Sequence, residues 1–155
     1  MITKQLGSNG PLVSAVGIGT WAWGDRIFLG YGDQYGEAEV ADAFQSAVQS
    51  GITLFDTAEI YGWGESERLL GKFYQGCQHP VSLATKYGPV PWRLGEDAVL
   101  QAIQDSLNRL QVEVIDLYQV HWPVNFLMSY ETLFRALAKA VQQGMIGTAL
   151  LRSDC

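Results

Sequence analysis

The sequence has little cysteine: only Cys77 and Cys155 among 155 residues. Two cysteines without a recognisable spacing are too few for a disulfide framework or a zinc site. The N-terminus has no charged stretch followed by an apolar one, and no window approaches 18 continuous apolar residues. Neither a signal peptide nor a membrane span is therefore expected. Together these absences predict a cytoplasmic protein in reducing surroundings, without a bound metal.

Basic residues are also scarce, with ten Lys and Arg against sixteen Asp and Glu and a net charge of −6. They are scattered singly, so no basic patch is available for a nucleic acid partner. Apolar residues make up 48% of the chain and glycine contributes 17 residues, whereas charged residues make up 17%. This composition excludes disorder, and the length is typical of one domain, here residues 1–155.

Two periodicities alternate along the chain. Apolar residues recur at helical spacing in four stretches, and short apolar runs rich in β-forming residues lie between them. The pattern predicts helices over 40–48, 66–75, 96–110 and 129–143, and strands over 15–19, 52–55, 81–85, 114–120 and 146–151. The segment before the first strand, through Asn9-Gly10-Pro11, is expected to form a polar turn.

Alternating strands and helices predict a parallel α/β fold with right-handed crossovers. Two architectures fit: an open doubly wound sheet, or part of a (β/α)₈ barrel of the TIM-barrel type. The open sheet requires an anion-binding loop after the first strand. Gly17-Ile18-Gly19-Thr20-Trp21-Ala22 matches the glycine pattern of such a loop, but no helix begins after it. This favours the barrel.

Ionisable side chains follow three of the apolar strands. Asp56, Lys86 and His121 each stand at a strand end, and Tyr61 lies in the loop after Asp56. Each alone has a structural explanation, such as a turn cap, a lysine reaching water or a packed ring. Because the carboxyl ends of parallel strands meet at one edge, their joint occurrence predicts a shared site.

The loop from Thr20 to Gly36 is long for a strand-to-helix connection and rich in aromatic residues. We expect it to form an aromatic wall over the mouth of the site; a hydrophobic plug without a ligand uses the same residues. These residues are Trp21, Trp23, Phe28, Tyr31 and Tyr35.

The segment 55–71, FDTAEIYGWGESERLLG, closely resembles the aldo-keto reductase family. Ala84-Thr85-Lys86, the segment 106–110 (SLNRL) and the segment 115–122 (IDLYQVHW) support the resemblance, which extends to Gly144. The family folds as a (β/α)₈ barrel and reduces aldehydes or ketones to alcohols with NADP(H).

The resemblance implies a role for each of the strand-end residues. The family's catalytic residues correspond to Asp56, Tyr61, Lys86 and His121, with Tyr61 as the proton donor. The implied cofactor-binding residues are Gly19, Thr20, Trp21 and Asp56, and the implied substrate-binding residues are Trp23, Trp92 and Trp122.

The length departs from the family pattern, because a complete barrel has about 250 residues. A chain of 155 residues is expected to hold the first four to five β/α units, and the sequence after Gly144 differs from the family's. In the family, most of the cofactor site lies beyond this point. An alternative is therefore a truncated, non-catalytic remnant or interaction module. Unpaired sheet edges also predict self-association.

Overall fold

Five parallel strands form the main sheet, in the order β3-β4-β5-β6-β7. The computed structural model describes residues 2–7, 10–122 and 127–151, so Cys155 lies outside the described residues. The strands are β3 (Ile18–Gly19), β4 (Leu54–Asp56), β5 (Ser82–Tyr87), β6 (Ile115–Val120) and β7 (Ile146–Leu151). Strand order follows chain order, which confirms the parallel α/β fold predicted from the alternating periodicities.

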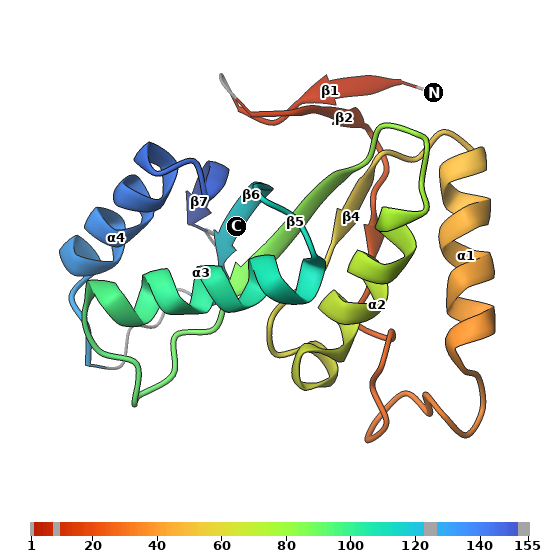
Figure 1. Cartoon of the computed structure of the whole chain (residues 1–155), viewed down its shortest axis with the longest axis horizontal. Helices are drawn as coiled ribbons and strands as arrows, with labels where there is room; N and C mark the ends of the chain where they lie inside the picture. The colour runs from red at the N-terminus through yellow and green to blue at the C-terminus, as the bar shows by residue number, and fades with distance from the viewer. Residues whose placement is uncertain (1, 8–9, 123–126, 152–155) are drawn as a thin grey trace.

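The helices follow the same order across the sheet (Figure 1). They are α1 (Glu37–Gln49), the 3₁₀ helix η1 (Tyr61–Gly64), α2 (Glu65–Gln75), α3 (Glu96–Leu110) and α4 (Tyr130–Gln142). The Ser129 side chain caps α4 by accepting the Thr132 N–H at 3.1 Å. Gly144, just after the helix, adopts the left-handed conformation that ends it. Val141 of α4 is exposed, whereas Leu137 and Ala140 lie on the buried face of the helix.

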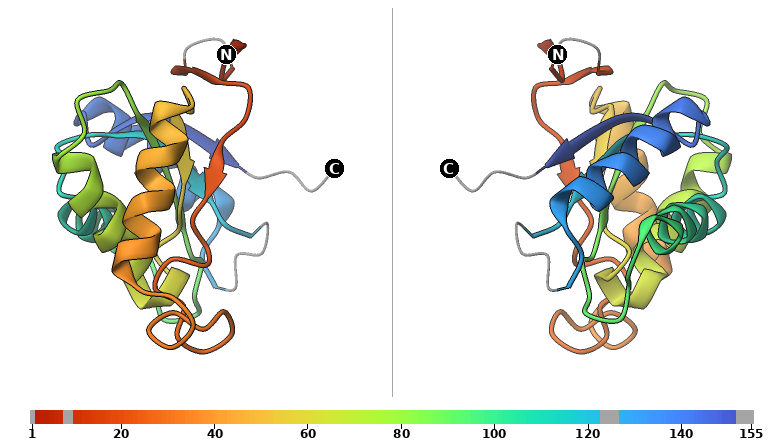
Figure 2. Two further views of the ribbon diagram at one scale, coloured as in Figure 1. Left: turned by 90° about the vertical axis from the view of Figure 1, so that its right-hand side faces the viewer. Right: turned by 90° about the vertical axis from the view of Figure 1, so that its left-hand side faces the viewer.

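The N-terminal segment contains two strands that the sequence did not predict. β1 (Thr3–Gln5) and β2 (Leu12–Ser14) pair antiparallel as a separate two-stranded sheet. The predicted turn between them is partly described, and Leu6 N donates to Pro11 O at 3.0 Å across it. Figure 2 shows this hairpin at one end of the main sheet and the Thr20–Gly36 loop at the other.

The hydrophobic core lies between the sheet and its helices. Phe55, Leu83 and Ile115 of the strands are at most 1% exposed, as are Leu70 and Ile103 of the helices. Near-continuous apolar strands are typical of a parallel sheet covered on both faces. None of the helices in the described part of the chain is long and apolar enough to cross a membrane.

Candidate active site

Asp56 and Lys86 form an ion pair where β4 ends and β5 approaches its end. Lys86 Nζ donates to Asp56 Oδ2 at 2.6 Å and to the Thr57 carbonyl at 2.7 Å. The other carboxylate oxygen, Asp56 Oδ1, accepts the Gln119 side-chain amide at 2.8 Å. The ammonium thus contacts two consecutive residues at the end of β4, the carboxylate is also held from β6, and Lys86 is only 5% exposed.

Tyr61 and His121 lie beside this ion pair. Lys86 Nζ is 5.1 Å from the centre of the Tyr61 ring. The rings of Tyr61 and His121 are 5.5 Å apart and nearly perpendicular. The fold brings together the four residues that the sequence placed at three strand ends and in one loop. Their catalytic roles stay predictions.

The backbone around Tyr61 is shaped by two residues in the left-handed region, Gly62 (φ 55°) and Trp63 (φ 56°). A Cβ at Gly62 would lie 2.7 Å from the Gly24 carbonyl oxygen, so only glycine allows this approach of the Thr20–Gly36 loop. The contact places the loop directly against η1, where Tyr61 is the first residue.

A buried carboxylate joins the two loops that surround the ion pair. Glu59 Oε1 accepts the Gly88 N–H and Arg93 Nη1, both at 2.5 Å. Burial by itself lowers the pKa of Arg93, but the hydrogen bond that Arg93 donates to Glu59 and the nearby negative charge together outweigh burial, so the pKa is raised. Glu59 therefore ties the loop after β5 to the segment that leads into Tyr61.

The residues implied for cofactor binding stand at the end of β3, where Gly19 pairs with Asp56. No heavy atom lies within 4 Å of a Cβ built on Gly19, and Trp21 is half-exposed, so the surface here is open and has a flat apolar side chain. These two residues fit one end of a nicotinamide cofactor. The Thr20 hydroxyl is buried and engaged with Ser66 Oγ at 2.7 Å, so it fastens the end of β3 to α2.

The three tryptophans implied for substrate binding lie in different surroundings. Trp23 is 6% exposed, and its ring packs in the core against Phe44, Phe55 and Phe73 and not in an open substrate site. It follows Trp21 by two residues, but the loop turns its side chain inward. Trp122 stacks on His121 with ring centres 4.6 Å apart. Trp92 is 78% exposed on the loop after β5.

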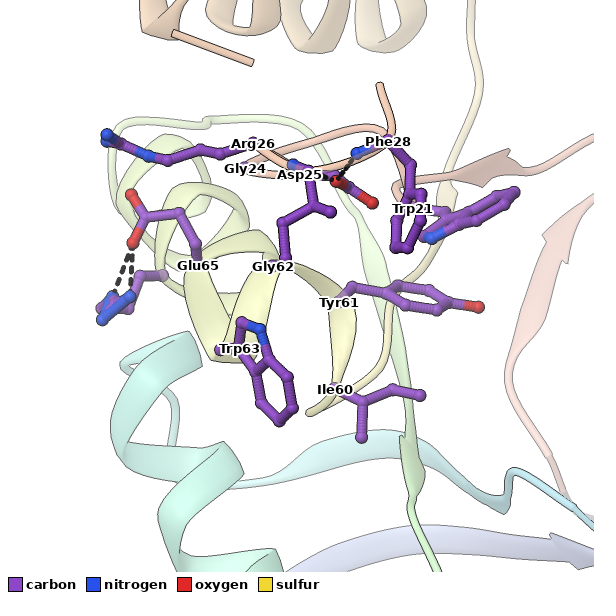
Figure 3. A pocket seen from close by; sticks show the side chains of 12 residues that line it. Trp21, Gly24, Asp25, Arg26, Phe28, Ile60, Tyr61, Gly62, Trp63 and Glu65 are labelled. Atoms are coloured by element: carbon purple, nitrogen blue, oxygen red, sulfur yellow. Dashed lines mark hydrogen bonds and ion pairs between the residues drawn. The ribbon is translucent and has the colours of Figure 1, made fainter. Parts of the chain in front are cut away.

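The aromatic loop has two faces rather than one. Tyr31 and Trp23 are buried, and the Tyr35 hydroxyl donates to the Ala22 carbonyl at 2.5 Å. Trp21 and Phe28 instead line a cavity of about 420 Å³ beside Tyr61. Figure 3 shows this cavity between the loop and the start of α2. Of the five aromatic residues, Trp21 and Phe28 thus line a cavity, whereas the other three pack within the protein. The role of the loop at the site stays a prediction.

Two polar residues of the site were missed. Gln119 stands two residues before His121, and side chains at that spacing in a strand share a face. This period-two relation could have identified it. Glu59 has no such signal, because its partner Arg93 lies 34 residues away in another loop.

Comparison with known proteins places these features in one family. A family model described as the aldo/keto reductase family matches residues 15–149. The chloroplastic pyridoxal reductase of Arabidopsis thaliana is 44% identical over 124 residues, which cover 73% of this chain and 34% of the relative. The methylglyoxal reductase YeaE of Escherichia coli is 35% identical over 147 residues, which cover 94% of this chain and 48% of the relative.

A solved structure agrees in fold over almost the whole chain. The aldo-keto reductase from Klebsiella pneumoniae, crystallised in complex with NADPH, superposes with a TM-score of 0.80 at 28% identity. The match covers 99% of this chain and 51% of that chain. The chain thus spans between a third and about half of the length of these three relatives.

Proposed function

The chain belongs to the aldo/keto reductase family, and on that premise we propose that its site serves NADP(H)-dependent reduction of an aldehyde or ketone to an alcohol. When bound, the cofactor would supply a hydride to the carbonyl carbon. The residues described here supply the proton for the oxygen and hold the substrate. The observation that carries the proposal is the buried Lys86 ammonium, held by Asp56 beside the Tyr61 ring.

Tyr61 is the proton donor. A free phenol has a pKa near 10 and releases its proton poorly at neutral pH. The Lys86 ammonium lies 5.1 Å from the centre of the Tyr61 ring, and a nearby positive charge favours the phenolate. We infer that the Lys86 ammonium makes the Tyr61 phenol a better acid as the alkoxide forms.

Asp56 and His121 support that step in different ways. Burial disfavours a charged amine, and the Asp56 carboxylate offsets this cost so that Lys86 stays protonated. Gln119 fixes the carboxylate through its second oxygen. The His121 imidazole, perpendicular to the Tyr61 ring, hydrogen-bonds the substrate oxygen and orients it toward the donor.

The cofactor and substrate would meet at the end of β3. Gly19, Trp21 and Asp56 hold one end of the cofactor, and Thr20 keeps the strand end in place. Trp92 and Trp122 contact the substrate, a small carbonyl compound. Pyridoxal reductase and methylglyoxal reductase, the names of two relatives, are consistent with that class. We place the protein in the cytoplasm, with residues 1–155 acting as a single domain.

The test is a Tyr61→Phe variant assayed for carbonyl reduction by NADPH. Loss of a positioned proton donor is expected to lower kcat by about 10²–10⁴ while the thermal melt is retained. Tyr74→Phe is the matched control, because it removes a hydroxyl from a half-buried tyrosine of α2. Turnover of Tyr61→Phe at the rate of the unmodified chain contradicts the assignment.

A second candidate is a non-catalytic remnant or interaction module that lacks most of the cofactor site. It is favoured by the share of the relatives' length that the chain spans. Titration with NADPH distinguishes the two. Quenching of tryptophan fluorescence supports the reductase, whereas no quenching at millimolar NADPH supports the remnant.

A further inference from the structure

α4 differs from the other α-helices in the side chains that it exposes. In the described part of the chain, α1, α2 and α3 expose no large apolar residue, whereas α4 exposes Tyr130 (43%), Phe134 (46%) and Val141 (41%). Single exposed apolar residues are common on protein surfaces. Three on one helix, with none on its neighbours, indicate a surface that another chain covers.

The exposed apolar residues form one stripe along the helix. Tyr130, Phe134, Ala138 and Val141 are all exposed and follow each other at intervals of four, four and three residues, which places them on one face. The Tyr130 and Phe134 rings are stacked, with centres 6.4 Å apart. These four residues are called the α4 stripe below.

The α4 stripe lies outside the contacts of α4 with the sheet and with α3. Leu133 and Leu137 face the core and are at most 2% exposed. Arg135 donates to Glu96 at the start of α3, at 2.9 Å. α4 is thus apolar on two faces, one against the core and one toward solvent. A surface helix of a complete globular unit normally has one apolar face.

The strand that follows α4 is also open on one side. β7 pairs with β6, and among the described residues no strand pairs with its other edge. Leu150 of β7 is 50% exposed. Figure 1 shows α4 and β7 together at one end of the molecule and α1 at the other. The α4 stripe and the open edge of β7 are therefore available to the same partner.

The opposite edge of the sheet offers no matching surface. β3 has only two residues, Ile18–Gly19. The exposed residues of α1, which follows β3, are polar or alanine: Glu37, Ala38, Glu39, Asp42, Ala43, Gln45, Ser46 and Gln49. A head-to-tail contact would set the Phe134 ring against this polar helix. The α4 stripe of a second copy is a better match, because it is apolar along its whole length.

We propose that the 155-residue chain forms a twofold dimer in which the β7 edges pair antiparallel and the α4 stripes pack against each other. A strand edge is self-complementary in antiparallel pairing, because both strands present the same row of N–H and C=O groups. A twofold axis perpendicular to the sheet keeps both copies of α4 on the same face of the joined sheet. The dimer does not depend on the proposed reductase function.

The spacing of strands and helices fits this arrangement. Adjacent strands lie about 4.8 Å apart, and a crossover helix covers the strands that it connects. The two copies of α4 would be separated by two strand spacings, or roughly 10 Å, which is a normal distance between packed helices. Antiparallel packing centred between Phe134 and Ala138 sets each Phe134 ring against the small Ala138 of the other copy, and Tyr130 beside Val141.

Sedimentation velocity of the whole chain over a range of concentrations tests the proposal. The unmodified chain is expected to form a species with the mass of two chains and nothing larger, because the twofold contact uses both β7 edges. Phe134→Glu places a charge in the α4 stripe and is expected to weaken the dimer about tenfold or more. An unmodified chain that stays monomeric, or grows beyond two chains, overturns the proposal.

Two matched variants separate this interface from other modes of association. Leu12→Glu places the same charge on a 66% exposed residue of β2, and Ala43→Glu places it on the exposed surface of α1. Each should change the dimer Kd by less than about twofold. Equal weakening by Phe134→Glu and Leu12→Glu would indicate nonspecific association, and weakening by Ala43→Glu a head-to-tail contact; both overturn the proposal. Thermal melts of all variants confirm that they remain folded.

Chemical crosslinking locates the axis directly. Ala138→Cys, in a background of Cys77→Ser and Cys155→Ser, gives each chain one thiol near the proposed twofold axis. A bismaleimide that spans about 10 Å should then join two chains, since that is the distance between packed helices. Ala43→Cys in the same background is the control and should remain uncrosslinked. Failure of Ala138→Cys to crosslink at concentrations where the dimer forms overturns the twofold arrangement.

Discussion

The Lys86 ammonium lies 2.6 Å from the Asp56 carboxylate, and the lysine side chain is only 6% exposed. Asp56 is more open, at 35% exposed, so water reaches the pair from the carboxylate side. A buried ammonium without a partner tends to lose its proton. The pair thus connects the stability of the fold to the charge that the proposed proton donor requires.

Asp56→Asn tests this connection. At pH 7 the variant is expected to lose about 1–3 kcal/mol of unfolding free energy, less than for a fully buried pair because Asp56 is partly exposed. Without the carboxylate, burial disfavours the charged form of Lys86 in the folded state. The unfolded chain then binds more protons, so the variant gains stability as pH rises.

Urea unfolding at pH 7 and pH 9.5 measures the effect, with Asp42→Asn on the exposed face of α1 as the control. The loss relative to the unmodified chain should be smaller at pH 9.5. An equal loss at both values would show that the charge of Lys86 is not involved.

Arg93→Met is expected to destabilise the chain by about 2–3 kcal/mol. It leaves the Glu59 carboxylate buried with only the Gly88 N–H as a described partner, and removing one member of a buried pair costs more than replacing both. The double variant Glu59→Gln/Arg93→Met should therefore be more stable than Arg93→Met alone. Chemical unfolding of the two single variants and the double variant checks this, and strictly additive losses would contradict it.

Gly62→Ala compares a steric clash with backbone strain alone. Gly144 also has a positive φ, of 72°, but nothing lies within 4 Å of a Cβ built on it. Gly144→Ala is expected to cost about 1–2 kcal/mol from strain. Gly62→Ala adds the contact with the Gly24 carbonyl, for a total of about 2–5 kcal/mol. Equal urea midpoints for the two variants would indicate that the loop and η1 can move apart without loss of stability.

The 155-residue chain is expected to self-associate. Within the described residues, β3 and β7 each pair with a neighbour on one side only, and an unpaired edge is a template for another chain. Size-exclusion chromatography should show an elution volume that falls as concentration rises. Leu150→Lys places a charge on β7 and should reduce the shift, whereas Val114→Lys, outside the strands, should not. A sharp monomer peak at all concentrations, with a cooperative melt, would count against this expectation.

Residues in periodic segments were predictable, and residues in the long loop were not. Sequence could predict the positions of Asp56, Lys86 and His121 because each follows a buried apolar strand. The carboxyl ends of parallel strands lie at the same edge of the sheet. Trp21 and Trp23 stand two residues apart in a loop without a period, and only one faces the cavity. The sequence did not predict β1. All three of its residues are exposed, so they show no alternation of apolar and polar side chains that would indicate a strand.

The sequence by itself determined the parallel α/β order, the strand-end residues and the family, because periodicity and motif spacing are local properties of the chain. Only the tertiary structure decided that Gln119 holds Asp56, that Glu59 reaches Arg93, and that Trp63 is held exposed beside a cavity. These relations depend on how separate loops approach each other. That approach follows from packing and close backbone contact, such as Gly62 against Gly24, which no single segment encodes.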